Sequence, residues 1–398
     1  MQLFNTTTSP ILSLTDYRRA VDAARYHNHC YFVLSAPEIT DAEFDELYFA
    51  IRAYETAHPD TVLPDSPTQR VGDDTAAGKH TIAHRTPMLS TQKVKTVSDI
   101  KHWMQLTSVR AADIIGCSIA DIDYTIEWKY DGVSCSLVYL NGKLIEASTR
   151  GNCENGQDIL NHVQQMNSIP KTIKATGRVE IRGEVLMPFA NLEQIPEGTY
   201  GDTRTAASAI LNSDNTTPYD SFLVFFPWEM TDHSGIGIPG GGDITHSVAP
   251  SLFWFLGFNT TITNIVVNAD NVEQVVENMT RRRVKLSFPT DGLVIKLNRT
   301  DIWPKMGRTD HHPKYLLAYK FPPATAETVC TSIDYTIGEK TGKITPIALF
   351  EPVTINGKQF SKASLGSNRI KDELGIAVGS RILVSLRNDV IPHVERVL

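Results

Sequence analysis

The stretch EWKYDGVSCS, residues 127–136, decides how the middle of the chain folds. It continues an alternation of apolar and polar residues that starts at Tyr124, and such alternation is typical of a β-strand. Successive side chains of a strand point to opposite faces, so Glu127 and Lys129 share one face of the predicted strand. The opposite face carries Tyr124, Ile126 and Trp128. A lysine that faces the interior is costly unless it is paired or used in chemistry.

The turn that follows, Asp131-Gly132, allows a structural and a chemical interpretation. Lys-x-Asp-Gly alone is a weak motif, and most chance occurrences would be surface turns. Four other short segments follow in the chain: STRG at 148–151, EIRGEV at 180–185, DGLVIK at 291–296 and AYKFPP at 318–323. Each places a charged residue among apolar ones at or across a predicted strand. Singly, each could be a strand end or a surface ion pair, whereas together they favour a chemical site.

Length and composition indicate a multidomain globular protein. The 398 residues are enough for two or three domains, and contents of 41% hydrophobic and 21% charged residues are ordinary. No apolar run approaches the roughly 20 residues that cross a bilayer, and the N-terminus lacks the pattern of a secretory signal. Five scattered cysteines without a Cys-x-x-Cys argue against a disulfide framework and against a structural zinc site. We therefore expect a cytoplasmic protein with reduced thiols and no membrane partner.

The net charge of −7 is not that of a general nucleic-acid binder, but the charge is uneven. Ten lysines and arginines lie between Arg281 and Lys320, against three aspartates. This segment could form a local surface that binds phosphates, although each residue singly could belong to a solvated face. His311-His312 has no further ligands at metal spacing, so it is expected to be a loop pair.

Residues 1–72 predict a small helical module. Apolar residues at helical spacing predict a helix from Thr15 to about Leu34, and Thr40-x-x-Glu43 is a capping box for a second helix. The apolar residues of this second helix trace one face: Phe44, Leu47, Tyr48, Ile51 and Tyr54.

Residues 73–322 predict a mixed α/β domain. SLVYLNGKLIEA at 136–147 predicts a hairpin with a type I′ turn at Asn141-Gly142. VEIRGEVLMP, LVFFPW, DGLVIKLN and YLLAYKF predict strands, and residues from Val272 to Arg283 predict a helix. SGIGIPGGGD at 234–243 lacks the Lys-Ser/Thr and the strand–helix frame of a phosphate loop, so it is expected to be a flexible connection.

Residues 323–398 carry short strand-like runs divided by glycine turns such as Asn356-Gly357. Such a pattern predicts a compact barrel of the oligonucleotide-binding (OB) type. The fold class expected for the whole chain is therefore multidomain α+β: a helical module, a mixed α/β domain and a C-terminal OB barrel.

The charged segments, in this order and at these separations, resemble the nucleotidyltransferase motifs of polynucleotide ligases and RNA-capping enzymes. Residues 36–72 resemble the N-terminal helical module of NAD-dependent DNA ligases, and TPMLS, TRTAAS and ITPIALFEPV are similar to other segments of that family. The resemblance extends from about residue 15 to residue 398. It implies that the mixed domain is a nucleotidyltransferase domain and that the helical module binds nicotinamide mononucleotide.

The resemblance also implies a reaction. A lysine would take AMP from NAD, release nicotinamide mononucleotide, and pass AMP to the 5′-phosphate of a nick in double-stranded DNA. The 3′-hydroxyl would then displace AMP and seal the strand. Mg²⁺ is implied as well, because a divalent ion neutralises the phosphates.

The family motifs assign roles residue by residue. Lys129 would be the nucleophile, which needs an uncharged amine, and Glu127 would contact adenine. Lys296 and Lys320 would stabilise charge on the α-phosphate. Asp131 would contact a ribose or a metal-bound water. Glu184 would contact the adenylate, or the metal through water. Arg150 would contact the ribose, and Ser90 and Arg283 would contact the nucleotide.

In the helical module, the resemblance assigns Tyr31, Asp41, Phe44 and Asp45 to the nicotinamide mononucleotide half of NAD. Two positions depart from the family, which usually has histidine at Phe32 and tyrosine at Phe44; both changes lose polar contacts but keep an aromatic face. Arg204 is retained as a contact to the nick, while Asn212 stands where an arginine is usual.

Several alternatives remain open. Family members continue into zinc, helix-hairpin-helix and often phosphopeptide-type modules, so the chain could be a minimal ligase, a fragment, or one subunit whose second chain supplies the helix-hairpin-helix part. Rival functions are an ATP-dependent ligase or a capping guanylyltransferase of the same superfamily, and a non-catalytic nick-binding protein. A redox enzyme that uses NAD is not supported, because no Gly-x-Gly-x-x-Gly leads from a predicted strand into a helix with an acidic residue downstream.

Overall fold

The computed structural model describes residues 11–32, 39, 41–69, 79–233, 235–236, 245–259, 264–309, 312–321, 325–337, 344–355, 358–365, 368–387 and 391–398. Thr40, His311, the Asn356-Gly357 turn and most of the glycine-rich stretch at 234–243 lie outside these residues. The chain divides into two compact units, Met1–Ile39 with Glu43–Phe321, and Thr40–Ala42 with Pro322–Leu398.

The first unit begins with the two predicted helices. They are α1 (Leu14–Phe32) and α2 (Asp41–Ala57), followed by a short 3₁₀ turn at Pro59–Thr61. Their facing apolar residues form one small core: Tyr17, Ala20, Val21, Ala23, Ala24, Leu47, Ile51 and Tyr54. Beside this core, the buried carboxylate of Glu55 accepts hydrogen bonds from the hydroxyl groups of Tyr17, Ser66 and Thr68. These hydroxyls fix the loop after α2 to both helices.

A central five-stranded sheet contains the strand with Glu127 and Lys129. Its order is β2 (Lys93–Val94), β11 (Leu316–Lys320), β10 (Thr290–Leu297), β3 (Tyr124–Tyr130) and β9 (Ile265–Val267). The predicted strands at DGLVIKLN and YLLAYKF are confirmed. Only β2 and β11 run parallel to each other among these paired strands.

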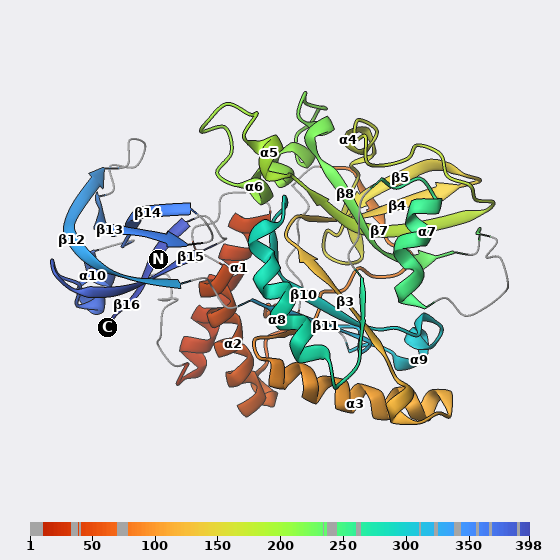
Figure 1. The fold of residues 1–398 in the computed structure, drawn as a ribbon, viewed down its shortest axis with the longest axis horizontal. Coiled ribbons are helices and arrows are strands. Elements are labelled where there is room, and N and C mark those ends of the chain that lie inside the picture. The colour runs from red at the N-terminus through yellow and green to blue at the C-terminus, as the bar shows by residue number, and fades with distance from the viewer. Residues whose placement is uncertain are drawn as a thin grey trace. The chain divides into compact units, whose positions relative to one another are not determined.

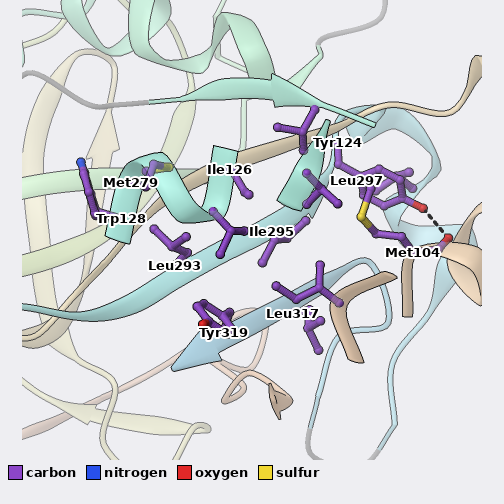
Figure 2. Packing of buried hydrophobic residues seen from close by; sticks show 14 of the residues in the cluster. Met104, Tyr124, Ile126, Trp128, Met279, Leu293, Ile295, Leu297, Leu317 and Tyr319 are labelled. Atoms are coloured by element: carbon purple, nitrogen blue, oxygen red, sulfur yellow. Dashed lines mark hydrogen bonds between the residues drawn. The ribbon is translucent and has the colours of Figure 1, made fainter. Parts of the chain in front are cut away.

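One face of this sheet is the hydrophobic core of the unit. Helices α3 (Val97–Ile115) and α8 (Val272–Arg282) pack on it (Figure 1). Figure 2 shows how Tyr124, Ile126 and Trp128 of β3 lie beside Leu293 and Ile295 of β10 within this core. Period-two alternation therefore leaves Glu127 and Lys129 on the other face, as the sequence predicts. The short helix α9 (Trp303–Met306) closes one end of the core.

A second sheet has the order β5 (Lys143–Thr149), β4 (Val133–Leu140), β7 (Arg178–Leu186) and β8 (Val224–Asp232). The hairpin β4–β5 turns at Asn141 and Gly142, whose φ angles of 49° and 81° are those of the predicted type I′ turn. A separate core lies against this sheet and includes residues of α4 (Leu160–Val163), α6 (Thr203–Leu211) and α7 (Ala249–Phe255). Helix α5 (Phe189–Leu192) and the two-stranded pair β1 (Thr81–Ala83) with β6 (Asn155–Gln157) complete the unit.

The second unit is the predicted barrel. Five strands close in the order β12 (Thr325–Ile337), β13 (Ile344–Ile355), β14 (Lys358–Ser364), β16 (Ile391–Val397) and β15 (Arg381–Arg387), with helix α10 (Asn368–Leu374) between β14 and β15. It has a hydrophobic core of its own, from Cys330 to Val394. Together the two units confirm the expected fold class. Among the helices that the structure describes, none combines the length and the apolar character needed to pass through a bilayer.

Candidate active site

Three neighbouring strands bring two lysines to the same level on the polar face of the central sheet. In the register of β3, β10 and β11, Gly292 lies opposite Lys129 on one side and opposite Lys320 on the other. Gly292 admits no side chain, because a Cβ atom would lie 2.0 Å from the carbonyl oxygen of Tyr319. The two lysines therefore flank a position that has no side chain, on the face of the sheet away from the hydrophobic core.

The ammonium group of Lys129 is paired with the carboxylate of Asp291. Lys129 Nζ lies 2.8 and 2.9 Å from the two carboxylate oxygens, and Lys320 Nζ lies 3.9 Å from one of them. Burial alone would raise the pKa of Asp291, but the ammonium groups of Lys129 and Lys320 outweigh burial and lower the pKa. Asp291 is therefore an ionised carboxylate held directly against the lysine amine.

The helical module adds Asp45 of α2 to the same cluster. One oxygen of Asp45 lies 2.6 Å from Lys320 Nζ and the other lies 3.3 Å from Lys93 Nζ. Burial raises the pKa of Asp45, but Lys93 and Lys320 outweigh it, so the pKa falls below its ordinary value. The ion pairs thus form a row of alternating charge, Lys129–Asp291–Lys320–Asp45–Lys93, which we call the lysine–aspartate cluster.

Glu127, two residues before Lys129 on the same face of β3, forms a second ion pair. Its Oε1 lies 2.5 Å from Lys296 Nζ, and both side chains are almost fully buried. Lys296 also donates a hydrogen bond to the carbonyl of Trp228 at 2.8 Å. The other oxygen, Glu127 Oε2, has no hydrogen-bond partner among the residues that the structure describes. A buried acceptor of this kind fits a ligand that donates a hydrogen bond.

His246 lies beside this pair and is buried as well. Burial and the ammonium of Lys296 hold the pKa of His246 well below its usual value, so the ring is neutral. Its Nε2 lies 3.2 Å from the carbonyl of Trp228, and its Nδ1 lies 2.9 Å from the hydroxyl of Thr125 and 3.1 Å from the amide nitrogen of Asn264. If Nε2 donates to the carbonyl of Trp228, Nδ1 is the acceptor for the hydroxyl of Thr125 or the amide of Asn264.

Two further carboxylates are Asp131, in the turn between β3 and β4, and Glu184, on β7. Asp131 is held by the guanidinium of Arg204 at 2.5 Å, and Glu184 accepts a hydrogen bond of 2.9 Å from the hydroxyl of Ser134. Burial raises the pKa of Glu184, and Arg204 opposes this. Mg²⁺ often binds through one or two carboxylates together with substrate phosphates, so this pair fits that ion. In the described part of the chain, no three histidine, cysteine, aspartate or glutamate side chains gather as a metal site.

Three other predicted contacts are anchored in the same unit. The backbone N–H of Arg150, just after β5, donates to the carbonyl of Ser134 at 3.1 Å. The carbonyl of Ser90 lies 3.1 Å from Nδ1 of His312, so this member of the histidine pair has a hydrogen-bonding role. Arg283, which directly follows α8, stacks its guanidinium over the ring of Phe321 at 4.9 Å.

The predicted nicotinamide contacts are only partly described. The backbones of Tyr31 and Phe32 end α1 and that of Asp41 begins α2, but their side chains lie outside the described residues. Phe44 is half-buried and packs against the small core of the helical module. Asn212, at the end of α6, donates to the hydroxyl of Ser208 at 3.4 Å.

The structure groups some residues that the sequence analysis did not single out. Asp291 opens the quoted segment DGLVIK, so its position beside Lys296 in the motif was a usable signal. Arg182, in the middle of EIRGEV, is buried and donates to the carbonyls of Thr86 and Pro87, which positions the loop before Ser90. Lys93 and His246 stand in no pattern that the sequence analysis used.

Comparisons with known proteins cover the whole region just described. Residues 15–72 match the family model for the DNA ligase-like, N-terminal NAD⁺-binding domain, residues 77–324 that for the NAD-dependent DNA ligase adenylation domain, and residues 327–398 that for the NAD-dependent DNA ligase OB-fold domain.

Two curated relatives are similar along nearly the whole chain. A DNA ligase of Nautilia profundicola is 32% identical over 397 residues, and a DNA ligase of Desulforudis audaxviator is 34% identical over 392 residues. These matches take in 98% and 95% of this chain but only 58% and 56% of the relatives. A solved structure named "Pmar-Lig_PreS3" is 11% identical with a TM-score of 0.36, covering 100% of this chain and 88% of that one. A likeness at that level does not bear on the assignment.

Proposed function

Since the chain belongs to the NAD-dependent DNA ligase family, we propose that it seals nicks in double-stranded DNA with NAD as the donor of AMP. The chain spans little more than half the length of its curated relatives, so the activity of a whole ligase is part of this proposal. The family also argues against ATP as the nucleotide, because the helical module matches an NAD⁺-binding domain.

The observation that carries the proposal is the arrangement along β3. Lys129 lies beside Asp291 and Lys320. Glu127, two residues away on the same face, has one buried oxygen that accepts no hydrogen bond from the residues that the structure describes. Two residues of a strand span about 6.6 Å. This spacing suits a nucleotide whose base donates to Glu127 Oε2 and whose phosphate reaches Lys129.

The first step is attack of Lys129 on the α-phosphate of NAD. The ammonium must first lose a proton, and Asp291, whose two oxygens contact Nζ, is the nearest acceptor. A bond then forms between Nζ and phosphorus, and the bond from phosphorus to the bridging oxygen breaks. The electron pair stays on that oxygen, so nicotinamide mononucleotide leaves and Lys129 carries AMP.

The geometry supports separate roles for the two lysines assigned to the α-phosphate. Lys320 stands beside the Lys129–Asp291 pair and is the cation that stabilises charge on that phosphate. Lys296 forms an ion pair with Glu127. On β10 it lies four residues, or about 13 Å, beyond Gly292, the residue opposite Lys129. Lys296 therefore belongs to the end of the site that would hold the base.

The later steps use the other predicted residues. AMP passes from Lys129 to the 5′-phosphate of the nick, and the 3′-hydroxyl then displaces AMP and closes the strand. Arg204 contacts the nick, and its ion pair with Asp131, itself a proposed contact of the adenylate, supports this role. Asp131 and Glu184 would hold Mg²⁺, which when bound supplies positive charge to the phosphates. Arg150, Ser90 and Arg283 hold the nucleotide, and Tyr31, Asp41, Phe44 and Asp45 hold its nicotinamide half.

The test is joining of a nicked duplex by the purified chain with Mg²⁺ and NAD as the sole nucleotide. We expect joined product with NAD, none with ATP, and none from Lys129→Ala. Joining by Lys129→Ala, or joining that depends on ATP alone, would contradict the proposal. If a second chain supplies part of the DNA grip, the chain will form lysyl-AMP from NAD but join the nick only when that chain is added.

A further inference from the structure

Lys93 extends the row of lysines to the edge of the central sheet. Strand β2 pairs with β11, and Lys93 lies opposite Ala318, two residues before Lys320. Residues two apart in a strand share a face, so Lys93 stands on the same face as Lys320 and Lys129. Across the sheet, the order is Lys129 on β3, Lys320 on β11 and Lys93 on β2.

The charges of the lysine–aspartate cluster leave room for an anion. Its ion pairs join three lysines to two carboxylates, and one carboxylate, Asp45, serves both Lys320 and Lys93. The ammonium groups of these three lysines lie side by side on one face, where they form a local positive potential that attracts the phosphates of a bound nucleotide. Burial and the nearby Lys320 lower the pKa of Lys93, as expected for an ammonium in the field of this cluster.

In-line displacement fixes where the leaving group must lie. The nucleophile and the leaving oxygen stand on opposite sides of the α-phosphorus. Lys129 is at one end of the row and Lys320 is in the middle. The far end, at Lys93, lies beside Asp45 of the helical module, whose family model is an NAD⁺-binding domain.

We propose that the ammonium of Lys93 contacts the phosphate of the departing nicotinamide mononucleotide in the first step. This inference rests on the proposed function. As the bond from the α-phosphorus to the bridging oxygen breaks, the electron pair stays on that oxygen and adds negative charge to the leaving phosphate. Lys93 stabilises this charge, while Lys320 stabilises the phosphate that stays on Lys129. Before NAD binds, Asp45 holds Lys93 in place.

The experiment separates the step that uses nicotinamide mononucleotide from the steps that do not. Lys93→Ala and Lys93→Arg are compared with the wild type and with Lys101→Ala, a matched control on the exposed side of α3 whose lysine pairs with Glu273. Three rates are measured: formation of lysyl-AMP at limiting NAD, its reversal by added nicotinamide mononucleotide, and sealing of a nick whose 5′-phosphate already carries AMP.

Lys93→Ala should slow the formation of lysyl-AMP and its reversal by about 10- to 100-fold, which is at or below the roughly 100- to 1000-fold cost of losing one transition-state donor. Sealing of the pre-adenylated nick should stay within about twofold, and Lys93→Arg, which keeps the charge, should recover most of the lost rate. Lys101→Ala should match the wild type in all three measurements.

Three results would overturn the inference: unchanged lysyl-AMP formation in Lys93→Ala, an equal loss in sealing of the pre-adenylated nick, or reversal by nicotinamide mononucleotide at the normal rate. If Lys93→Ala fails to fold, Lys93→Gln decides by the same measurements. A wild-type chain that forms no lysyl-AMP from NAD would instead contradict the proposed function, so the two failures are distinguishable.

Discussion

The buried ion pair between Glu127 and Lys296 contributes to the stability of the fold around the site. Both side chains are almost fully buried, so removing either leaves a charge without compensation. We expect Glu127→Ala to lower the free energy of unfolding by about 3–5 kcal/mol, as for other buried pairs. Adding Lys296→Met should restore much of that stability without restoring activity. Denaturant unfolding of the single and double variants measures this, and a Glu127→Ala protein as stable as the wild type would contradict the role of the pair.

Asp45 links the stability of the site to pH. Its folded pKa lies below the ordinary value of 3.8, so the native contacts stabilise the ionised form. This contribution is complete above about pH 4 and is lost as the pH falls through the lower folded pKa. The difference in unfolding free energy between the wild type and Asp45→Asn should therefore be constant from pH 7 to pH 5 and shrink below about pH 4. If this difference in unfolding free energy grows as the pH falls, the ion pairs of Asp45 do not stabilise the folded state.

Sequence reasoning at this scale predicts which side chains share a face but not all of their neighbours. Alternation alone places Glu127 and Lys129 on one face, because both lie on one strand. The alternation could not predict the ion pairs Lys129–Asp291 and Asp45–Lys320, because each joins residues far apart in the chain. Such pairs follow from strand register and from the packing of α2, which no local pattern specifies.

Among the secondary-structure elements, β10 packs closely between β3 and β11 because Gly292 has no side chain. A Cβ atom there would lie 2.0 Å from the carbonyl oxygen of Tyr319, so backbone must move. We expect Gly292→Ala to lower the free energy of unfolding by about 1–3 kcal/mol, the cost typical of overpacking. It should also slow lysyl-AMP formation, since β10 and β11 carry Asp291 and Lys320. Val294→Ala, on the same face of β10, is a control that adds no atom. Normal adenylation by Gly292→Ala would show that the spacing of the two lysines is not critical.

Elements with strong local signals were predicted well. The β4–β5 hairpin follows from Asn141-Gly142, and the strands β3, β7, β8, β10 and β11 follow from their apolar runs. Helix α3 was missed, although Thr96 caps its start by accepting from the backbone of Asp99 and Gly116 ends it in the left-handed conformation. Strand β2, with two residues, is too short for any periodicity. Lys93 was missed for that reason.

At the scale of the whole molecule, the first unit holds every residue assigned to the first step apart from Asp41. The barrel has a hydrophobic core of its own. We expect a fragment of residues 1–321 to melt cooperatively and to form lysyl-AMP from NAD, but to join nicks poorly. Calorimetry and an adenylation assay check this. A fragment that folds but takes no AMP would show that the barrel contributes to the first step.

We predict that Lys129 becomes covalently linked to AMP taken from NAD. Mass spectrometry of the protein after incubation with NAD and Mg²⁺, followed by peptide mapping, tests it most directly. We expect one added adenylate on the peptide that contains Lys129, absent from Lys129→Ala and removed by nicotinamide mononucleotide. Folded protein in which Lys129 stays unmodified, or in which another side chain carries the adenylate, would contradict it.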